Sequence, residues 1–163
     1  MKIGVSSCLV GINCTYSGSH NLISGLKKLY KDDKIIIACP EVLGGLSIPR
    51  DPAEIQGKEP FVIKTNKNQD VTYEYIKGAN KALNIFLEND VKIAILKFRS
   101  PSCGNDGVYD GSFSHRLIEG QGVFAQLLEE HGIKVFNEYQ IDEFLKYIKD
   151  DEYSQYFKNE EDL

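Results

Sequence analysis

The chain has 163 residues, which is enough for one domain with a substantial hydrophobic core. Its composition, 42% hydrophobic and 26% charged, is typical of a globular protein and excludes a disordered or fibrous chain. The formal charge of −5 lies entirely in residues 150–163, so residues 1–149 are balanced and offer no basic field that would attract nucleic acid.

The beginning of the chain indicates the compartment. Residues 1–5 lack the layout of a signal peptide, and no stretch approaches the ~20 apolar residues that a membrane span requires. A cytoplasmic, reducing location is therefore expected, in which the four cysteines are free or metal-bound rather than paired in disulfides.

Short apolar runs alternate with helical patterns in the first half of the chain. Strands are predicted at 2–7 and 34–38, with a helix at about 20–31 between them. Residues 39–60 hold four of the five prolines, which predicts a long loop without a regular element. A short extra strand is predicted at 61–64.

The second half continues the alternation. The predicted elements are a helix at 71–89, a strand at 91–97, a glycine-rich loop at 98–120, a helix at 121–131, a strand at 133–136 and a helix at 140–150. This order predicts a single three-layer α/β domain over residues 1–149, Rossmann-like, with a mostly parallel sheet of four or five strands and helices on both faces.

Residues 150–163 form an acidic C-terminal tail with six acids and one base. A solvated, partly frayed end is the favoured interpretation. The alternative is that Tyr153, Tyr156 and Phe157 dock part of the tail as a last helical turn.

Three cysteines follow predicted strands, namely Cys8, Cys39 and Cys103. The carboxyl ends of parallel strands meet along one edge of a sheet, so these thiols are expected to converge there and could hold a metal or an iron–sulfur cluster. The alternative is that they are small buried apolar residues. Three ligands would leave a metal position open, as catalysis requires. Cys14 is either a fourth ligand or, as we favour, a packing neighbour.

Polar residues beside these cysteines are candidates for chemistry. Glu41 lies two residues after Cys39, where burial would suit it to proton transfer; the alternative is a solvated loop acid. Ser100 and Ser102 precede Cys103, although serine is also an ordinary turn residue. Tyr109 and Asp110 could line the same pocket or simply form a turn.

Several segments together resemble one known family, the thiouracil desulfidases (TudS-like), formerly a domain of unknown function. They are Ser6-Ser7-Cys8-Leu9-Val10-Gly11, Cys39-Pro40-Glu41-Val42-Leu43-Gly44-Gly45-Leu46, Pro49-Arg50, Pro52-Ala53-Glu54, Ser100-Pro101-Ser102-Cys103-Gly104, Tyr109-Asp110-Gly111 and His131-Gly132-Ile133-Lys134-Val135-Phe136-Asn137-Glu138. The similarity runs from about residue 3 to residue 138, and its cysteine–proline–glutamate stretch is highly specific.

The resemblance implies a [4Fe–4S] cluster held by three cysteines, here Cys8, Cys39 and Cys103, with one iron open to the sulfur of a thiolated pyrimidine. 2-Thiouracil would then become uracil, with oxygen from water. The catalytic glutamate and serine of the family match Glu41 and Ser100. The chain departs from the family in its first loop, where Thr15-Tyr16-Ser17-Gly18 stands in place of Arg-Tyr-Asp-Gly, so specificity could differ.

Four functions therefore compete. The first is a desulfidase that acts on a small thiolated base or nucleoside, with Ser102, Tyr109 and Asp110 as substrate-binding residues. The others are a sulfur carrier or inserter, a cluster-based redox or iron sensor, and a structural zinc protein without catalysis. No partner nucleic acid or membrane is expected from the balanced charge. Iron, acid-labile sulfide and activity on thiouracil would separate the four.

Overall fold

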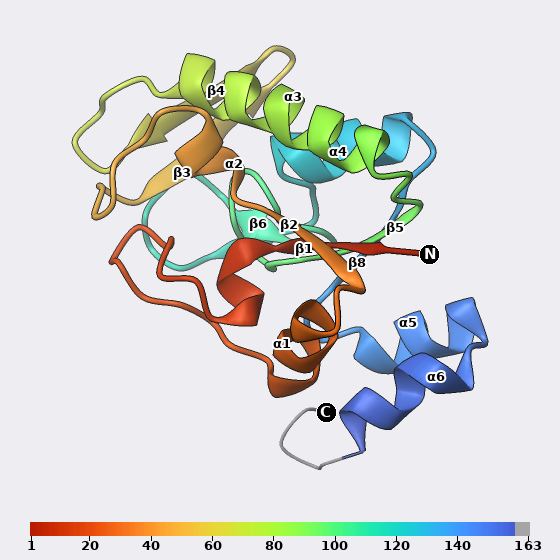
Figure 1. Ribbon diagram of the computed structural model, residues 1–163. Coiled ribbons are helices and arrows are strands. Elements are labelled where there is room, and N and C mark those ends of the chain that lie inside the picture. The colour runs from red at the N-terminus through yellow and green to blue at the C-terminus, as the bar shows by residue number, and fades with distance from the viewer. Residues whose placement is uncertain (159–163) are drawn as a thin grey trace.

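The computed structural model describes residues 1–158, and its centre is a parallel sheet (Figure 1). In spatial order the strands are β2 (Ile35–Ala38), β1 (Ile3–Ser6), β5 (Ile93–Leu96) and β8 (Lys134–Asn137). All three pairings are parallel, so all four strands end at the same edge. The predicted α/β class is confirmed, with four strands in the sheet.

The central strands are apolar because both of their faces are covered. Every residue of β1 and β5 is buried, as expected for strands between two helical layers. Gly4 in β1 is required by close packing, because a Cβ there would lie 2.4 Å from the ring of Phe86.

Helices cover the two faces of the sheet (Figure 1). On one face lie α3 (Thr72–Glu88) and α4 (Val123–Glu130), and on the other lie α1 (Ser24–Lys31), α5 (Ile141–Ile148) and α6 (Asp151–Ser154). Each layer has its own core, centred on Phe86 and Phe124 on the first face and on Phe144 and Leu26 on the second. The helix predicted at about 20–31 is shorter at its start, because α1 begins at Ser24.

The described part of the acidic C-terminal segment docks onto the domain. It forms α6 and the 3₁₀ helix η2 (Gln155–Phe157), in which Tyr153 and Phe157 are buried. The Tyr153 hydroxyl donates to the carbonyl of Met1 at 2.6 Å, and Lys34 pairs with Glu152 at 2.5 Å. The aromatic side chains therefore attach this segment to α1, the alternative that the sequence left open. The predicted tail also includes residues 159–163, which lie outside the described residues.

The prediction that residues 39–60 hold no regular element is wrong. The segment contains α2 (Pro40–Leu43) and β3 (Ala53–Lys58), and β3 pairs antiparallel with β4 (Phe61–Thr65) in a separate hairpin. The prolines border these elements rather than interrupt them. Pro40 stands at the first turn of α2, where no backbone N–H is needed.

The remaining elements lie at the carboxyl edge of the sheet. The 3₁₀ helix η1 (Ser7–Val10) follows β1 directly, and the glycine-rich loop contains a small hairpin of β6 (Val108–Tyr109) and β7 (Leu117–Ile118). These segments and the β3–β4 hairpin surround the edge where the strands end (Figure 1).

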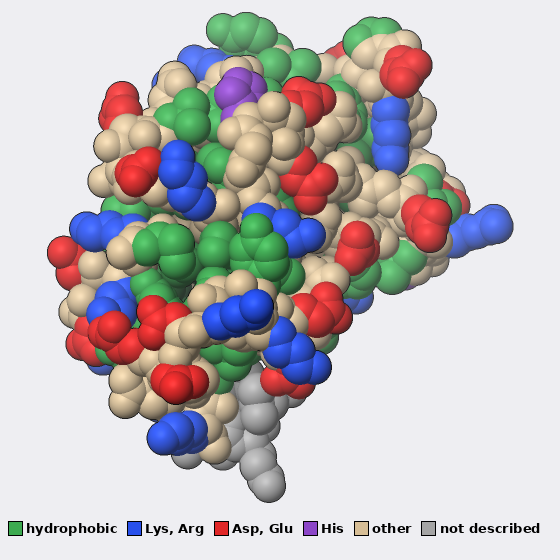
Figure 2. Space-filling view, turned by 90° about the vertical axis from the view of Figure 1, so that its right-hand side faces the viewer, with side chains coloured by type: hydrophobic (Ala, Val, Ile, Leu, Met, Phe, Trp, Pro, Cys, Tyr) green, Lys and Arg blue, Asp and Glu red, His purple; other side chains and the backbone are tan. Residues whose placement is uncertain are grey.

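No helix within residues 1–158 is long and apolar enough to cross a membrane. On the face that lies at the right-hand side of Figure 1, acidic and basic side chains are intermingled with apolar ones (Figure 2). Neither sign of charge forms a continuous field on that face.

Candidate active site

The first thiol of the site is placed by the turn that follows β1. The chain passes from Ser6 directly into η1, which carries Cys8, and Gly11 closes the turn with a left-handed φ of 96°. A side chain at this φ would be strained, so glycine is the suitable residue. Cys8 is buried at the end of the sheet as a result.

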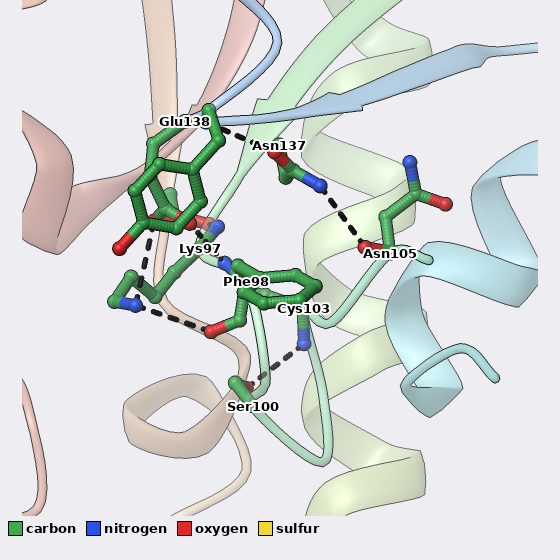
Figure 3. A network of polar contacts seen from close by, with 9 residues as sticks. Lys97, Phe98, Ser100, Cys103, Asn105, Asn137 and Glu138 are labelled. Atoms are coloured by element: carbon green, nitrogen blue, oxygen red, sulfur yellow. Dashed lines mark hydrogen bonds and ion pairs between the residues drawn. The ribbon is translucent and has the colours of Figure 1, made fainter. Parts of the chain in front are cut away.

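The second and third thiols follow β2 and β5. Cys39 is the N-cap residue of α2, directly after β2, and is half-buried. Cys103 lies in the turn after β5, where its backbone N–H donates to Ser100 Oγ at 3.0 Å (Figure 3). The Asn137 side chain donates to the carbonyl of Asn105 at 3.1 Å, which fixes this turn to β8. Three of the four strands of the sheet, β1, β2 and β5, are therefore each followed by one cysteine.

The three thiols open into one cavity of 660 Å³, together with Cys14. The cavity is also lined by Glu41, Ser100 and Tyr109 from the predicted site residues. Two further predicted residues do not line it: Ser102 is fully buried behind Glu41, and Asp110 lies in the adjoining loop.

Cys14 lies against two of the other thiols. The neighbouring thiols of Cys39 and Cys8 raise the pKa of Cys14. Cys14 is in turn the main cause of the lowered pKa of Cys8. The carbonyl of Cys14 is also 3.8 Å from Cys39 Sγ. Cys14 is thus a member of the thiol group in space, although its place in the chain suggested a neighbour behind the site.

Cys103 has a different environment. Complete burial raises the pKa of its thiol, because a thiolate there would lose its hydration. Its sulfur lies 3.6 Å from Ser102 Oγ, whose proton is donated to Glu41. A metal bound at this thiol would offset the lost hydration with its positive charge.

A carboxylate and two hydroxyls form a compact array beside the thiols. Ser102 Oγ donates to Glu41 Oε1 at 2.5 Å, and Ser100 Oγ lies 2.8 Å from Ser102 Oγ and 3.3 Å from Glu41 Oε1. The second carboxylate oxygen, Oε2, lies 3.6 Å from Cys39 Sγ. Glu41 is buried, and it connects the serine turn after β5 with the cysteine turn after β2.

The direction of the hydrogen bonds in this array can be worked out. Ser100 Oγ accepts the backbone N–H groups of Ser102 and Cys103 at 3.1 and 3.0 Å. Its acceptor capacity is then filled, so its proton points toward Ser102 or Glu41. Because Ser102 donates its own proton to Glu41, both hydroxyl protons are directed at one carboxylate. The array can carry a proton between the cavity wall and Glu41.

The outer wall is formed by the loop that follows β6. Tyr109 packs edge-on against His115, with ring centroids 5.7 Å apart, and both line the cavity together with Phe113. The buried Glu54 carboxylate accepts the backbone N–H groups of Gly111 and Phe113 at 2.9 and 3.1 Å. Glu54 therefore holds this aromatic loop over the cavity.

Asp110 shapes that loop from outside. Its carboxylate accepts the backbone N–H and the hydroxyl of Ser112, and these bonds lower the pKa of Asp110. An ionised Asp110 therefore stabilises the turn that carries Phe113.

The loop in which the chain departs from the family pattern lies at the cavity mouth. Thr15, Ser17 and Ser19 form a triangle of hydroxyls with oxygen separations of 3.0 to 3.3 Å, and all three line the cavity. Arg50 donates to the carbonyl of Cys14 at 2.9 Å and so ties this loop to the β3 side of the site. Neutral hydroxyls thus occupy a place where the family pattern has a pair of opposite charges.

Sequence reasoning missed several lining residues. Lys97, Arg50 and Phe113 all line the cavity. His115 also lines it, although a surface role is the favoured expectation from its place in the glycine-rich loop. A signal existed for Lys97, since a lysine ends a fully apolar run at a strand end. Arg50 and Phe113 lie in loops, where neither spacing nor periodicity indicates which way a side chain points.

The expected iron–sulfur cluster can be tested against these donors. Thiolates are the ligands that such clusters use, and the thiols enter the cavity from three separate turns. Among residues 1–158, no group of three or more Cys, His, Asp or Glu side chains is arranged to hold a single metal ion. A cluster instead attaches each thiolate to a different iron, which requires sulfurs distributed around a larger space. The donor set and the cavity fit a cluster.

Comparisons with known proteins found similar chains. The family model described as 2-thiouracil desulfurase matches residues 3–140. A relative from Bacillus subtilis, the uncharacterized protein YbbK, is 43% identical over 148 residues, which cover 86% of this chain and 98% of YbbK. A solved structure, the [4Fe-4S]-dependent thiouracil desulfidase TudS, superposes with a TM-score of 0.84 at 39% identity, covering 91% of this chain and 97% of TudS.

Proposed function

The chain belongs to the 2-thiouracil desulfurase family, and we propose that it is an enzyme that removes sulfur from a small thiolated pyrimidine such as 2-thiouracil. The observation that carries the proposal is the convergence of the thiols with the Glu41 array in one cavity. The likeness to a [4Fe-4S]-dependent thiouracil desulfidase supports the same chemistry. We assign the activity to residues 1–149, within which the family match lies.

Cys8, Cys39 and Cys103 are the residues that would hold a [4Fe–4S] cluster. They come from three different strand ends and line the same cavity. When bound, such a cluster supplies a soft Lewis-acidic iron with one position open to a sulfur ligand. Cys14 remains a thiol beside Cys8 and Cys39 in this scheme and is not a ligand. The four cysteines are free, which suits a reducing, cytoplasmic location.

Glu41 moves the protons of the reaction. Replacement of C=S by C=O uses one water molecule and releases hydrogen sulfide, so both protons of water must reach the leaving sulfur. Binding of a metal group by Cys39 removes its thiol proton, which frees Glu41 Oε2 for a water molecule or a substrate N–H. Ser102 is a positioning residue that orients Glu41, whereas Ser100 relays a proton at the cavity wall.

The cavity suits a flat ring. Tyr109, Phe113 and His115 provide aromatic faces and edges against which a pyrimidine can pack. The hydroxyls of Thr15 and Ser17 supply neutral hydrogen-bonding groups at the mouth. These features support a small, uncharged base or nucleoside as the substrate. Asp110 contributes by keeping the Tyr109 loop in place.

The Glu41→Gln variant tests the function. Glutamine preserves shape and one acceptor oxygen but cannot accept and release a proton, so cluster absorbance should be retained and desulfidation should fall by about 10²–10⁴-fold. Glu119→Gln, the same change at an exposed position in the glycine-rich loop, is the matched control. A Glu41→Gln variant that works at the wild-type rate would remove the proton-transfer role.

A substrate competition tests the class of substrate. Anaerobically reconstituted protein is offered free 2-thiouracil and thiolated tRNA at equal thiocarbonyl concentration and low salt. We expect sulfur loss from the free base, because residues 1–149 carry no net charge to attract a polyanion. Faster loss from tRNA would contradict the proposal. A brown, iron-containing protein that is inactive on every thiolated base would instead favour a cluster-based sensor.

A further inference from the structure

A lysine points into the cavity from the end of β5. Lys97 follows Leu96 directly, its side chain is 20% exposed, and it lines the cavity with the cysteines. Its ammonium group lies 3.2 Å from the carbonyl of Phe98 and 3.5 Å from Glu138 Oε2 (Figure 3). An ammonium has three donors, and those are the two partners found for it among residues 1–158, so one donor remains for the cavity.

The carboxylate beside it comes from the neighbouring strand. Glu138 follows β8, and its side chain is 9% exposed. Oε1 accepts the backbone N–H of Phe98 at 2.7 Å (Figure 3). Oε2 is buried, and apart from the ion pair with Lys97 it has no hydrogen-bond partner within the described part of the chain. Burial raises the pKa of Glu138, although the charge of Lys97 opposes the shift.

The ion pair of Lys97 and Glu138 contributes little to the stability of the fold by itself. Removing two charges from water costs several kcal/mol each, and a contact of 3.5 Å with an unsatisfied oxygen returns little of that cost. A buried pair that is this loosely matched is better explained by a third charged group nearby. The cavity would supply one, since cysteines that bind a metal group do so as thiolates, and four cysteines line this cavity.

Two other cations line the cavity. Arg50 donates to the carbonyls of Cys14 and Ser47, so its guanidinium is committed to the loops. Arg99 lies over the ring of Phe98, with its guanidinium carbon 5.7 Å from the ring centroid. Lys97 differs from both because the Glu138 carboxylate holds its ammonium group at the end of β5.

We propose that Lys97, held in place by Glu138, is the cation that balances the negative charge of the cysteine cavity and stabilises the bound cluster. The inference rests on the proposed function, because it requires a cluster in this cavity. Lys97 is a positioning residue here, which acts through charge and does not itself react. Charge close to an iron–sulfur cluster is one of the factors that set its reduction potential.

The test compares neutral and charged residues at position 97. Lys97→Met and Lys97→Gln remove the charge at similar length, and Lys97→Arg keeps it. The matched control is Lys92→Met, an exposed lysine just before the other end of β5 that pairs with Asp90. Each protein is reconstituted anaerobically. The reduction potential is then titrated with spectroscopic detection, and iron release to a chelator is timed.

We expect both neutral variants to have a more negative potential and to release iron several-fold faster than wild type. Lys97→Arg and Lys92→Met should resemble wild type. Neutral variants that assemble no cluster while Lys97→Arg does would be the same result in a stronger form. A purely structural ion pair would lower the melting temperature of the neutral variants and leave the potential unchanged, which would overturn the proposal.

Equal changes in reduction potential and iron release in Lys97→Arg and Lys97→Met would also overturn the proposal. Side-chain packing and not charge would then be responsible for the changes. If the wild-type chain itself assembles no cluster, the proposed function fails, and this inference fails with it. The two failures are therefore distinguishable in one experiment.

Discussion

The close contact between α2 and α3 predicts a large loss of stability when one methyl group is added at Gly78. A Cβ at Gly78 in α3 would lie 1.7 Å from the carbonyl oxygen of Pro40, and one at Gly44 would lie 1.9 Å from the carbonyl oxygen of Glu74. Ordinary contacts of a Cβ begin at 3.4 Å, so Gly78→Ala requires the two backbones to separate by about the difference, 1.7 Å.

Two opposing effects decide whether Gly78→Ala raises or lowers the free energy of unfolding. Alanine is favoured over glycine in a helix by about 1 kcal/mol. Overpacking typically costs about 1–3 kcal/mol, and the upper end applies because the clash is with backbone and not with a flexible side chain. We therefore expect Gly78→Ala to lower the free energy of unfolding by about 2 kcal/mol.

The same change should disturb the site, because Pro40 stands between Cys39 and Glu41. Urea unfolding measures the stability, and iron per chain after reconstitution measures the site. Asn84→Ala on the exposed side of α3 is the control. If Gly78→Ala unfolds at higher urea than wild type and binds as much iron, the gain in helix propensity exceeds the cost of overpacking. The predicted clash between α2 and α3 is then refuted.

Three further predictions follow from the site and the C-terminal segment. Cys14→Ser should retain most of the iron after reconstitution, whereas serine at each of the other three cysteines should lose it; equal iron loss in Cys14→Ser would contradict the three-ligand scheme. Phe157→Ala should lower the free energy of unfolding by about 3–5 kcal/mol, because the ring is buried against α1, and an unchanged urea midpoint would show that the segment does not contribute to the core. Hydrogen bonds from Ser112 lower the pKa of Asp110. The ionised carboxylate therefore stabilises its loop fully at pH values above the pKa of an ordinary aspartate, and the effect is lost as the pH falls through the lowered pKa. Limited proteolysis should therefore cut the loop in acid but not at pH 7, and Asp110→Asn should be cut at both.

The sequence predicted the sheet because its two central strands are fully buried. The apolar runs that became β1 and β5 have no exposed face, and the long periodic pattern before residue 89 became α3. Of the β3–β4 hairpin, the sequence predicted β4 but not β3. Glu54 and Ile55 are both buried although they are neighbours, so β3 lacks the alternation that indicates a strand.

The site was predicted as far as it depends on strand ends. Cys8, Cys39 and Cys103 converge because parallel strands end at one edge, and this follows from topology alone. The thiol contacts of Cys14 and the charge pair of Lys97 and Glu138 depend on side-chain direction in loops and at the edge. Spacing along the chain carries no information on either, since their partners are as many as 41 residues away.

The separation of the three cysteines along the chain bears on whether folding or cluster assembly comes first. In zinc sites with closely spaced cysteines, the metal can nucleate a local fold because its ligands are already neighbours. Here the cysteines at 8, 39 and 103 are 31 and 64 residues apart, and closing such long loops is entropically unfavourable until β2, β1 and β5 have paired. The proposed cluster would therefore assemble after the chain has folded, and a donor of iron and sulfide would recognise the folded cavity and not a nascent chain.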